Sequence, residues 1–331
     1  MRQAQENAKN RLKTTGAVEY EIKVDAAAFA DYSLSFEPYL FNRTEHLATQ
    51  RRKNPVSIGL QSSEDGRIAA VLHLNLSGAE ALSLPQAPFG GVQAAPDLPP
   101  EALARVLEAA ENWCHTNKVG KLVIRTAPAD YDEMQSARLK TVYGNGGFAP
   151  IGTLVNHHIR VTAAPFLDRI HTSERRRLRK CLRAGFTAEI WETPDPAQVY
   201  AFLTESRKRQ GYPLSLDYHQ LRELLTSLPR QAQVFVVKNK DQLVSLTVGI
   251  RVSATILYNF CPADNLDYRS YSPMVLLNGY LYEYAQSAGI ELIDLGVSLD
   301  HLGNEKASLM RFKENLGAEK SEKVTYEKVY C

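Results

Sequence analysis

Two charged side chains near the C-terminus have the residue types that acyl transfer requires. Asp294 lies at the end of the apolar run IELIDLG, a predicted strand, and a carboxylate there could deprotonate or orient an attacking amine. Lys313 follows in a short predicted helix, where its ammonium could stabilise the oxyanion of a tetrahedral intermediate. Each has an ordinary alternative: Asp294 could tie down the loop after its strand, and Lys313 could be an exposed helix lysine.

The strand and loop before the helix predicted to start at Ser272-Pro273 supply further candidates. Tyr258, Tyr268 and Tyr271 cluster around the predicted strand 254–262 and the loop after it. One of them could act as a general acid, although with 16 tyrosines in the chain any one could simply pack. We assign Tyr271 the catalytic role and Tyr258 a role in binding the donor. Arg269 and Ser272 are donor-binding candidates, because they stand next to a predicted helix N-terminus that could face phosphate.

A basic segment lies between the two halves of the chain. Residues 165–184 contain seven Lys or Arg against two acidic residues, and the pattern predicts a helix that ends near Gly185. Arg175, Arg179 and Arg183 are four residues apart and share one face. We take Arg175 and Arg179 as donor-binding candidates that could contact phosphate or tRNA. The alternative is a solvated charged face that pairs with acids elsewhere.

The elements that would position these residues occur twice, in the same order and at offsets of 169–178 residues. The first series is a hairpin over 55–76, a helix from Pro99-Pro100 to Gly120, a strand over 121–126, a helix over 131–143 and a strand over 151–161. The second is strands over 233–239, 242–252 and 254–262, a helix from Ser272-Pro273 to Gly289, a strand over 290–296, a helix over 304–315 and a strand over 321–330. The pattern predicts an α/β (α+β) fold of two duplicated domains, 1–164 and 165–331, with mixed sheets flanked by helices. The alternative is that the two series coincide by chance, because this order of elements is common in α/β proteins.

Three segments resemble the FemAB-like group of tandem GNAT proteins over most of residues 50–330. The first is the basic helix and strand start ERRRLRKCLRAGFTAEI, residues 174–190. The second combines Tyr271-Ser272-Pro273 with Gly289-x4-Asp294-x-Gly296, and the third is MRFKENLG, residues 310–317, which is similar to the group's F-K-x-x-[FL]-G. The resemblance implies two GNAT domains, with the acyl-transfer site in the second and the acceptor site shaped by the first.

The resemblance also implies an activity. Known enzymes of the group move aminoacyl groups from tRNA to peptidoglycan precursors, so we expect an N-acyltransferase with an acyl-CoA or aminoacyl-tRNA donor. The acceptor would be an amine, for instance on a cell-wall precursor. The stretch 265–273 departs from the pattern, since it lacks the glycines that cradle coenzyme A phosphates, and Asp267 would repel them. A non-catalytic module that binds a glycan, a lipid-linked precursor or a protein is therefore the alternative.

Composition restricts the other function classes. The chain has 331 residues, is 44% hydrophobic and carries a net charge of +2, which argues against a basic DNA-binding coat. No apolar run approaches the ~20 residues of a membrane span, and the four cysteines form no CxxC pair. Adjacent His157 and His158 would point to opposite faces of a strand and could not both bind one metal ion, so we expect no metal site. We also expect no tightly bound cofactor. The expected location is cytoplasmic, and the oligomeric state is left open.

Overall fold

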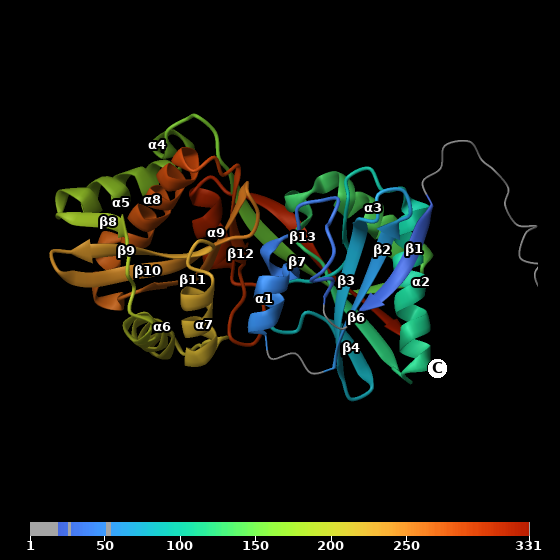
Figure 1. Ribbon diagram of the computed structural model, residues 1–331. Helices are drawn as coiled ribbons and strands as arrows, with labels where there is room; N and C mark the ends of the chain where they lie inside the picture. The colour runs from blue at the N-terminus through green and yellow to red at the C-terminus, as the bar shows by residue number, and fades with distance from the viewer. Residues whose placement is uncertain (1–18, 26–27, 51–53, 331) are drawn as a thin grey trace, which may run out of the picture.

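The computed structural model describes residues 19–25, 28–50 and 54–330 (Figure 1). The first half of the chain contains β1 (Tyr20–Asp25), η1 (Leu40–Asn42), α1 (Thr44–Thr49), β2 (Pro55–Ser62), β3 (Ile68–Ser77), β4 (Glu80–Ser83), β5 (Gln93–Ala94), α2 (Pro100–Thr116), β6 (Lys121–Arg125), η2 (Ala129–Tyr131), α3 (Glu133–Asn145) and β7 (Ala149–Arg160). The second half contains α4 (Phe166–Arg169), α5 (Thr172–Arg183), β8 (Phe186–Ile190), α6 (Pro196–Gln210), α7 (Tyr218–Ser227), β9 (Ala232–Asn239), β10 (Gln242–Arg251), β11 (Ile256–Asp264), η3 (Leu266–Tyr271), α8 (Pro273–Ser287), β12 (Leu292–Val297), α9 (Ala307–Asn315) and β13 (Glu319–Val329).

The two halves repeat one series of elements, as the sequence predicts. The run β2, β3, β4, α2, β6, α3, β7 in the first half corresponds to β9, β10, β11, α8, β12, α9, β13 in the second. The predicted helix starts are also confirmed, because Pro100 and Pro273 occupy the first turns of α2 and α8. The α/β fold of duplicated domains is therefore correct. The first series of predicted elements began at residue 55, so the sequence analysis missed β1, η1 and α1.

All described strands join into one 13-stranded sheet, and the halves exchange strands at its centre. The order is β1-β2-β3-β4-β6-β13-β7-β12-β11-β10-β9-β8, with β5 beside β3. The last strand of the chain, β13, pairs with β6 of the first half, while β7 pairs with β12 of the second half. Figure 1 shows β7 and β13 between the two groups of strands. The boundary proposed at residues 164 and 165 thus divides a continuous sheet.

Parallel neighbours in each half pair only briefly and then diverge. In the first half, β4 pairs with β6 from Glu80 to Leu82, and in the second, β11 pairs with β12 from Ile256 to Tyr258. The chain after β4 fills the first divergence, where Gly90 N–H donates to the carbonyl of Arg125 at 2.8 Å. Gly91 has a φ of 88°, which favours glycine there. The first half therefore closes the opening that the second half keeps for other side chains.

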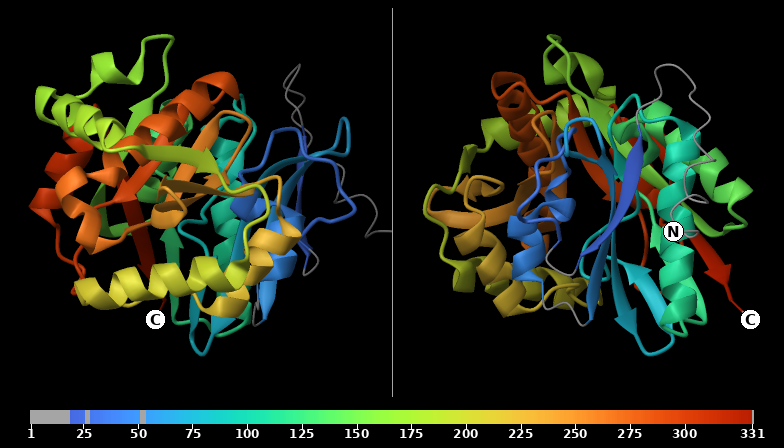
Figure 2. Two further views of the ribbon diagram at one scale, coloured as in Figure 1. Left: turned by 90° about the vertical axis from the view of Figure 1, so that its left-hand side faces the viewer. Right: turned by 45° about the vertical axis from the view of Figure 1, so that its right-hand side comes forward.

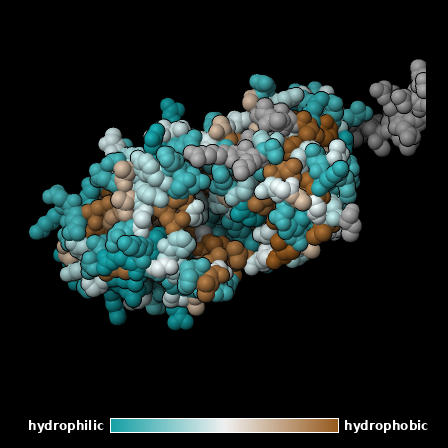
Figure 3. All heavy atoms as spheres, turned by 90° about the horizontal axis from the view of Figure 1, so that it is seen from below, coloured by the Kyte–Doolittle hydropathy of each residue, from teal (hydrophilic) through white to brown (hydrophobic). Residues whose placement is uncertain are grey.

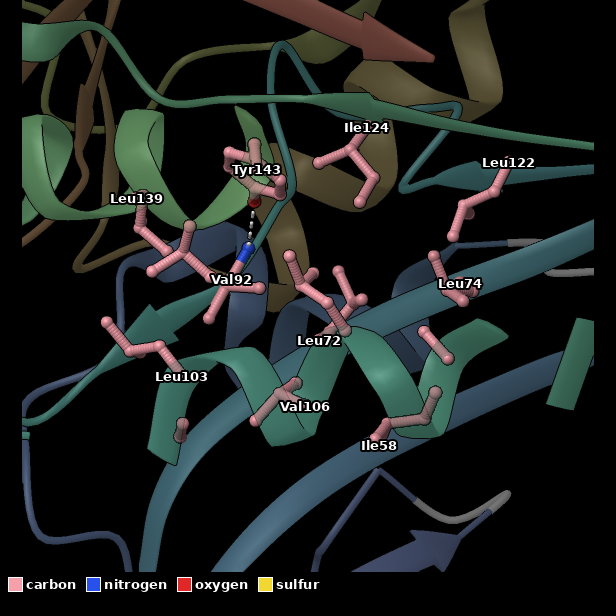
Figure 4. Packing of buried hydrophobic residues seen from close by; sticks show 14 of the residues in the cluster. Ile58, Leu72, Leu74, Val92, Leu103, Val106, Leu122, Ile124, Leu139 and Tyr143 are labelled. Carbon is pink, nitrogen blue, oxygen red and sulfur yellow. Dashed lines mark hydrogen bonds between the residues drawn. The ribbon is translucent and has the colours of Figure 1, made fainter. Parts of the chain in front are cut away.

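Three large apolar clusters stabilise the sheet. In the first half, Leu103 and Val106 of α2 and Leu139 and Tyr143 of α3 pack on the strands (Figure 4). In the second half, α5 and α8 pack on strands of that half. Figure 2 shows these helices from two further sides. The third cluster joins the halves, because Leu40, Phe41 and Phe89 pack with α6, α7 and β9–β11.

One predicted helix end is wrong. Gly120 was expected to end α2 as Gly289 ends α8, and Gly289 does have a φ of 68° just after α8. However, α2 ends at Thr116, and Lys118 takes the left-handed conformation with a φ of 53°. Gly120 stands directly before β6 instead. The two glycines are therefore close in the repeat without having the same conformation.

Two surface properties complete the description. None of the helices described is long and apolar enough to cross a membrane. From below, much of the second half is covered by hydrophilic side chains, with apolar patches where the halves meet and on the first half (Figure 3).

The exchanged strands predict that neither half folds by itself. Residues 1–164 would lose β12 and β13, so that β7 would have no partner strand and β6 would keep only its short pairing with β4. We expect residues 1–164 and 165–331, expressed separately, to show no cooperative thermal unfolding, and to form a soluble complex when co-expressed. A cooperative melting transition for residues 1–164 alone, measured by circular dichroism beside the intact chain, would contradict this.

Candidate active site

Asp294 lies at the junction of the two halves, on the strand next to β7. Its side chain is only 3% exposed. One carboxylate oxygen, Oδ1, accepts hydrogen bonds from Asn156 Nδ2 at 2.8 Å and from the backbone N–H of Gly296 at 2.7 Å. The other, Oδ2, accepts from the Tyr131 hydroxyl at 2.8 Å. Since Tyr131 and Asn156 belong to the first half, the acid is shared between the halves.

The environment of this carboxylate has opposing electrostatic effects. Burial raises the pKa of Asp294, while the hydrogen bonds from Asn156, Gly296 and Tyr131 act in the opposite direction. Gly296 belongs to the same strand, β12, so this contact joins Asp294 to the end of its own strand and not to the loop that follows. With three donors on a carboxylate that can accept about four, one acceptor position remains for a substrate.

Lys313 is buried beside the end of β12 and is not the exposed helix lysine of the alternative interpretation. It is 6% exposed, and its ammonium donates to the carbonyls of Gly296 at 2.8 Å and Val297 at 2.9 Å. Burial lowers the pKa of Lys313 to about 8, and the nearby charge of Asp294 partly opposes this shift. Two of its three N–H groups are thus used, and the third is available to an oxyanion.

The end of β12, which both residues contact, depends on a glycine. Gly296 has a φ of 71°, and a Cβ added there would lie 3.4 Å from the ring of Tyr258. A larger residue would therefore meet both backbone strain and the tyrosine. Tyr258 is partly buried, and desolvation of its hydroxyl, followed by the charge of Asp294, raises the pKa of that hydroxyl. The structure thus brings three of the predicted site residues together: Asp294, Lys313 and Tyr258.

Four residues of the site were not found from the sequence: Tyr131, Asn156, His157 and Lys323. His157 points away from Asn156, and neither of its ring nitrogens has a hydrogen-bond partner among the described residues. Burial, and then the charge of Lys313, lower the pKa of His157 to about 4. The ammonium of Lys323 lies 5.9 Å from the ring centre of Phe89. Its side chain makes no hydrogen bond or ion pair within the described ranges. Burial lowers its pKa, while the charge of Asp294 opposes the shift.

The other catalytic candidate, Tyr271, lies elsewhere. Its ring packs 5.1 Å from that of Phe186 and lies under the ammonium of Lys180 at 5.0 Å. None of its contacts involves Asp294 or Lys313. Ser272 has a φ of 57° and precedes α8, and its side chain makes no capping hydrogen bond. Arg269 is exposed, and its Nε lies 3.7 Å from Oδ2 of Asp264. The roles of these three residues remain predictions.

The arginines of the basic helix divide into two kinds. Arg175 donates to the carbonyls of Ile170 and Asp168 at 3.0 and 3.1 Å, so it holds the preceding loop. Arg179 is exposed, and its side chain makes no hydrogen bond or ion pair with any described residue. A groove between α5 and α9 is lined by Arg177, Arg311, Ala307, Ser308, Phe312 and Asn315. The expected repulsion of phosphate by Asp267 is reduced, because Arg209 pairs with this carboxylate at 2.7 Å.

Two further observations concern ligands. A pocket of about 60 Å³ in the first half lies between the chain near Gly91 and α3, and Tyr131 forms part of its wall. Neither Asp294 nor Lys313 lines it. No group of three or more His, Cys, Asp or Glu side chains among the described residues is arranged to hold a metal ion.

Comparisons with known proteins agree with this architecture. Residues 171–314 match the family model described as an acetyltransferase (GNAT) domain. The crystal structure of FemX has 16% identity and a TM-score of 0.66, covering 89% of this chain and 93% of its own. A tandem GNAT protein from the clavulanic acid biosynthesis pathway has 13% identity and a TM-score of 0.56, covering 94% and 98%.

A third structure is the C-terminal domain of a putative lysylphosphatidylglycerol synthetase from Agrobacterium fabrum. It has 13% identity and a TM-score of 0.54, covering 80% of this chain and 82% of its own. No curated protein sequence matches the chain. At these identities the structures show the fold, and with the family match they confirm the resemblance to FemAB-like, tandem GNAT proteins.

The buried ammonium of Lys313 predicts a pH-dependent stability difference. Because the pKa of Lys313 falls from 10.5 to about 8 on folding, the folded state disfavours the charged form. This penalty is fully present below pH 8 and is relieved as the pH approaches 10.5. The wild type should therefore gain stability relative to Lys313→Met over that interval, at most by roughly 1.4 kcal/mol per unit of pKa shift. Urea unfolding at a series of pH values measures the difference.

The matched control is Lys208→Met, which removes an exposed lysine of α6. Wild type and Lys313→Met curves that stay parallel from pH 8 to 10 would show that burial of Lys313 does not disfavour its charge.

Proposed function

We propose that the chain is an N-acyltransferase whose reaction centre comprises Asp294 and Lys313 at the junction of the halves. The observation that carries the proposal is the buried ammonium of Lys313, which donates to the carbonyl of Gly296, two residues after Asp294, inside the segment that matches the GNAT family. An ammonium held away from water stabilises negative charge far better than one in solvent. Each residue also keeps one hydrogen-bonding position for a substrate.

The proposed reaction transfers an acyl group to an amine. The amine nitrogen attacks the acyl carbonyl, and the free N–H of Lys313 stabilises the oxyanion that forms. Asp294 accepts the proton that the nitrogen loses. Collapse of the intermediate breaks the bond to the sulfur of a thioester or the oxygen of a tRNA ester, and the proton leaves with that group.

Two donor classes fit the surface beside this centre: acyl-CoA and aminoacyl-tRNA. Both carry phosphates, which the exposed Arg179 and the groove at Arg177 and Arg311 could contact. The glycine-free loop folds as η3 and is held by Arg209 and by Lys180, which donates to the carbonyl of Ser270 at 2.7 Å. This loop provides no glycine cradle for a pyrophosphate, which supports an aminoacyl-tRNA donor over coenzyme A. The FemAB-like resemblance agrees with that preference and with an amine acceptor on a cell-wall precursor.

The same loop supports the second candidate, a non-catalytic binding module. If η3 and the Arg209–Asp267 pair close the donor site, the fold would retain only ligand binding. Glycans, lipid-linked precursors and proteins are the ligand classes of this alternative.

A thermal-shift panel separates the two candidates. The panel contains acetyl-CoA, longer acyl-CoAs, aminoacyl-tRNA and, as the matched control, the same tRNA without its aminoacyl group. A donor at about 100 times its dissociation constant adds about 2.7 kcal/mol of stability, so its melting shift is readily measured. A shift with a donor supports the transferase. No melting shift with any donor, together with a melting shift from a glycan or lipid-linked precursor, would favour the binding module.

Substitution of Lys313 should impair turnover. Lys313→Met should lower kcat at least about tenfold, because the oxyanion loses its charged partner. Wild-type activity should fall as the pH rises through about 8, since Lys313 then loses its proton. Lys313→Arg stays charged, so its residual activity should not fall over that range. Wild-type turnover in both Lys313→Met and Asp294→Asn would reject this reaction centre.

A further inference from the structure

We infer that Tyr131 of the first half is a positioning residue for Asp294, holding its carboxylate in the orientation and charge state that acyl transfer needs. The inference rests on the proposed function and deepens it. The GNAT family match begins at residue 171, so Tyr131 lies outside the matched segment. The reaction centre would then be composite, with the acid from one half and its positioning group from the other.

The hydrogen bonds to Asp294 show why this tyrosine has a particular role. Oδ1 has two donors, Asn156 and the backbone of Gly296, whereas Oδ2 has Tyr131 alone. Removing the phenol hydroxyl would leave Oδ2 buried without a donor, which is costly for a charged oxygen. Among these contacts, the Tyr131 bond is therefore the one that offsets the burial of Oδ2 and helps the carboxylate stay ionised.

The first half fixes Tyr131 from several sides. Its ring packs edge-on against Phe89 at 5.5 Å and against Tyr39 at 5.4 Å. The preceding residue, Asp130, lies 2.9 Å from Nδ1 of His158 and accepts a hydrogen bond from Ser321, so η2 is fastened to β7 and β13. A side chain held by packing and by its neighbour's contacts with His158 and Ser321 has little freedom to turn its hydroxyl away from Asp294.

Titratable groups from every adjoining element surround the carboxylate. They are Tyr131 and Asp130 on η2, Tyr258 on β11, His158 on β7, Lys313 on α9 and Lys323 on β13. Burial strongly raises the pKa of Tyr131, so its hydroxyl keeps its proton and remains a donor. A donor to the ionised acid lowers the pKa of Asp294, against the effect of burial. Without this donor the acid should take up a proton at higher pH.

Tyr131→Phe tests the inference, with Tyr39→Phe as its matched control. Phenylalanine keeps the ring packing and removes only the hydroxyl. Tyr39 stands in the same aromatic cluster, but its hydroxyl makes no hydrogen bond with any described residue. The first readout is the ¹³C carboxyl titration of Asp294 in the protein without substrate, with its resonance assigned by Asp294→Asn. The second is the pH profile of kcat.

Tyr131→Phe should move the Asp294 titration and the acidic limb of the kcat profile to higher pH. Turnover near neutral pH should fall on the order of tenfold and recover partly as the pH rises. Tyr39→Phe should move neither. An unchanged titration in Tyr131→Phe, or an equal loss of kcat at all pH values, would overturn the positioning role.

A further variant guards against a folding defect in Tyr131→Phe. Incorporation of 3-fluorotyrosine at position 131 gives a stronger donor of nearly the same size, so it should shift the Asp294 titration to lower pH. A shift in the same direction as Tyr131→Phe would also overturn the inference. The carboxyl titration needs no substrate, so an inactive protein with the expected shifts would reject the proposed transferase and keep the Tyr131–Asp294 coupling.

Discussion

The exchange of the two closing strands is the constraint on which the site depends. Because β7 of the first half pairs with β12, Asn156 reaches the carboxylate of Asp294 from the neighbouring strand. Because β13 pairs with β6 and β7, Lys323 comes from the end of the chain to the same region. Two unconnected domains would not bring Asn156 to the acid. The duplicated fold thus produces one shared centre, and burial at that centre then shifts the pKa values of its charged groups.

The halves have the same architecture but differ where parallel strands diverge. In the first half, the chain at Gly90 enters the opening and bonds to Arg125, and the hydroxyl of Tyr143 accepts the N–H of Val92. In the second half, the positive φ of Gly296 turns the chain so that its carbonyl meets the ammonium of Lys313. Filling one opening and placing a buried cation at the other assigns the proposed chemistry to the second half, while the first contributes contacts to the acid.

Local patterns in the sequence were sufficient for the order of elements from β2 onward, and for placing Asp294 on a strand and Lys313 in a helix. Helical spacing, proline at helix starts and a strand ending in a carboxylate are all properties of short segments. Tyr131 and Asn156 could not be found in this way, because each donates a hydrogen bond to Asp294 across 163 and 138 residues of chain. The wrong helix end at Gly120 arose because Lys118 accepts a left-handed conformation that the sequence would assign to glycine. The burial of Lys313 likewise depends on tertiary packing, which its own helix does not reveal.

A structure with a bound donor analogue tests the central claim most directly. The analogue would carry a non-hydrolysable amide or thioether in place of the reactive ester or thioester, on a tRNA 3′-end mimic or on coenzyme A. The account predicts that the acyl oxygen lies about 3 Å from Nζ of Lys313, between β11 and β12, with the open side of the acyl carbon toward Asp294. An acyl group bound instead in the first-half pocket beside Tyr39 and Gln135, away from Lys313, would contradict it.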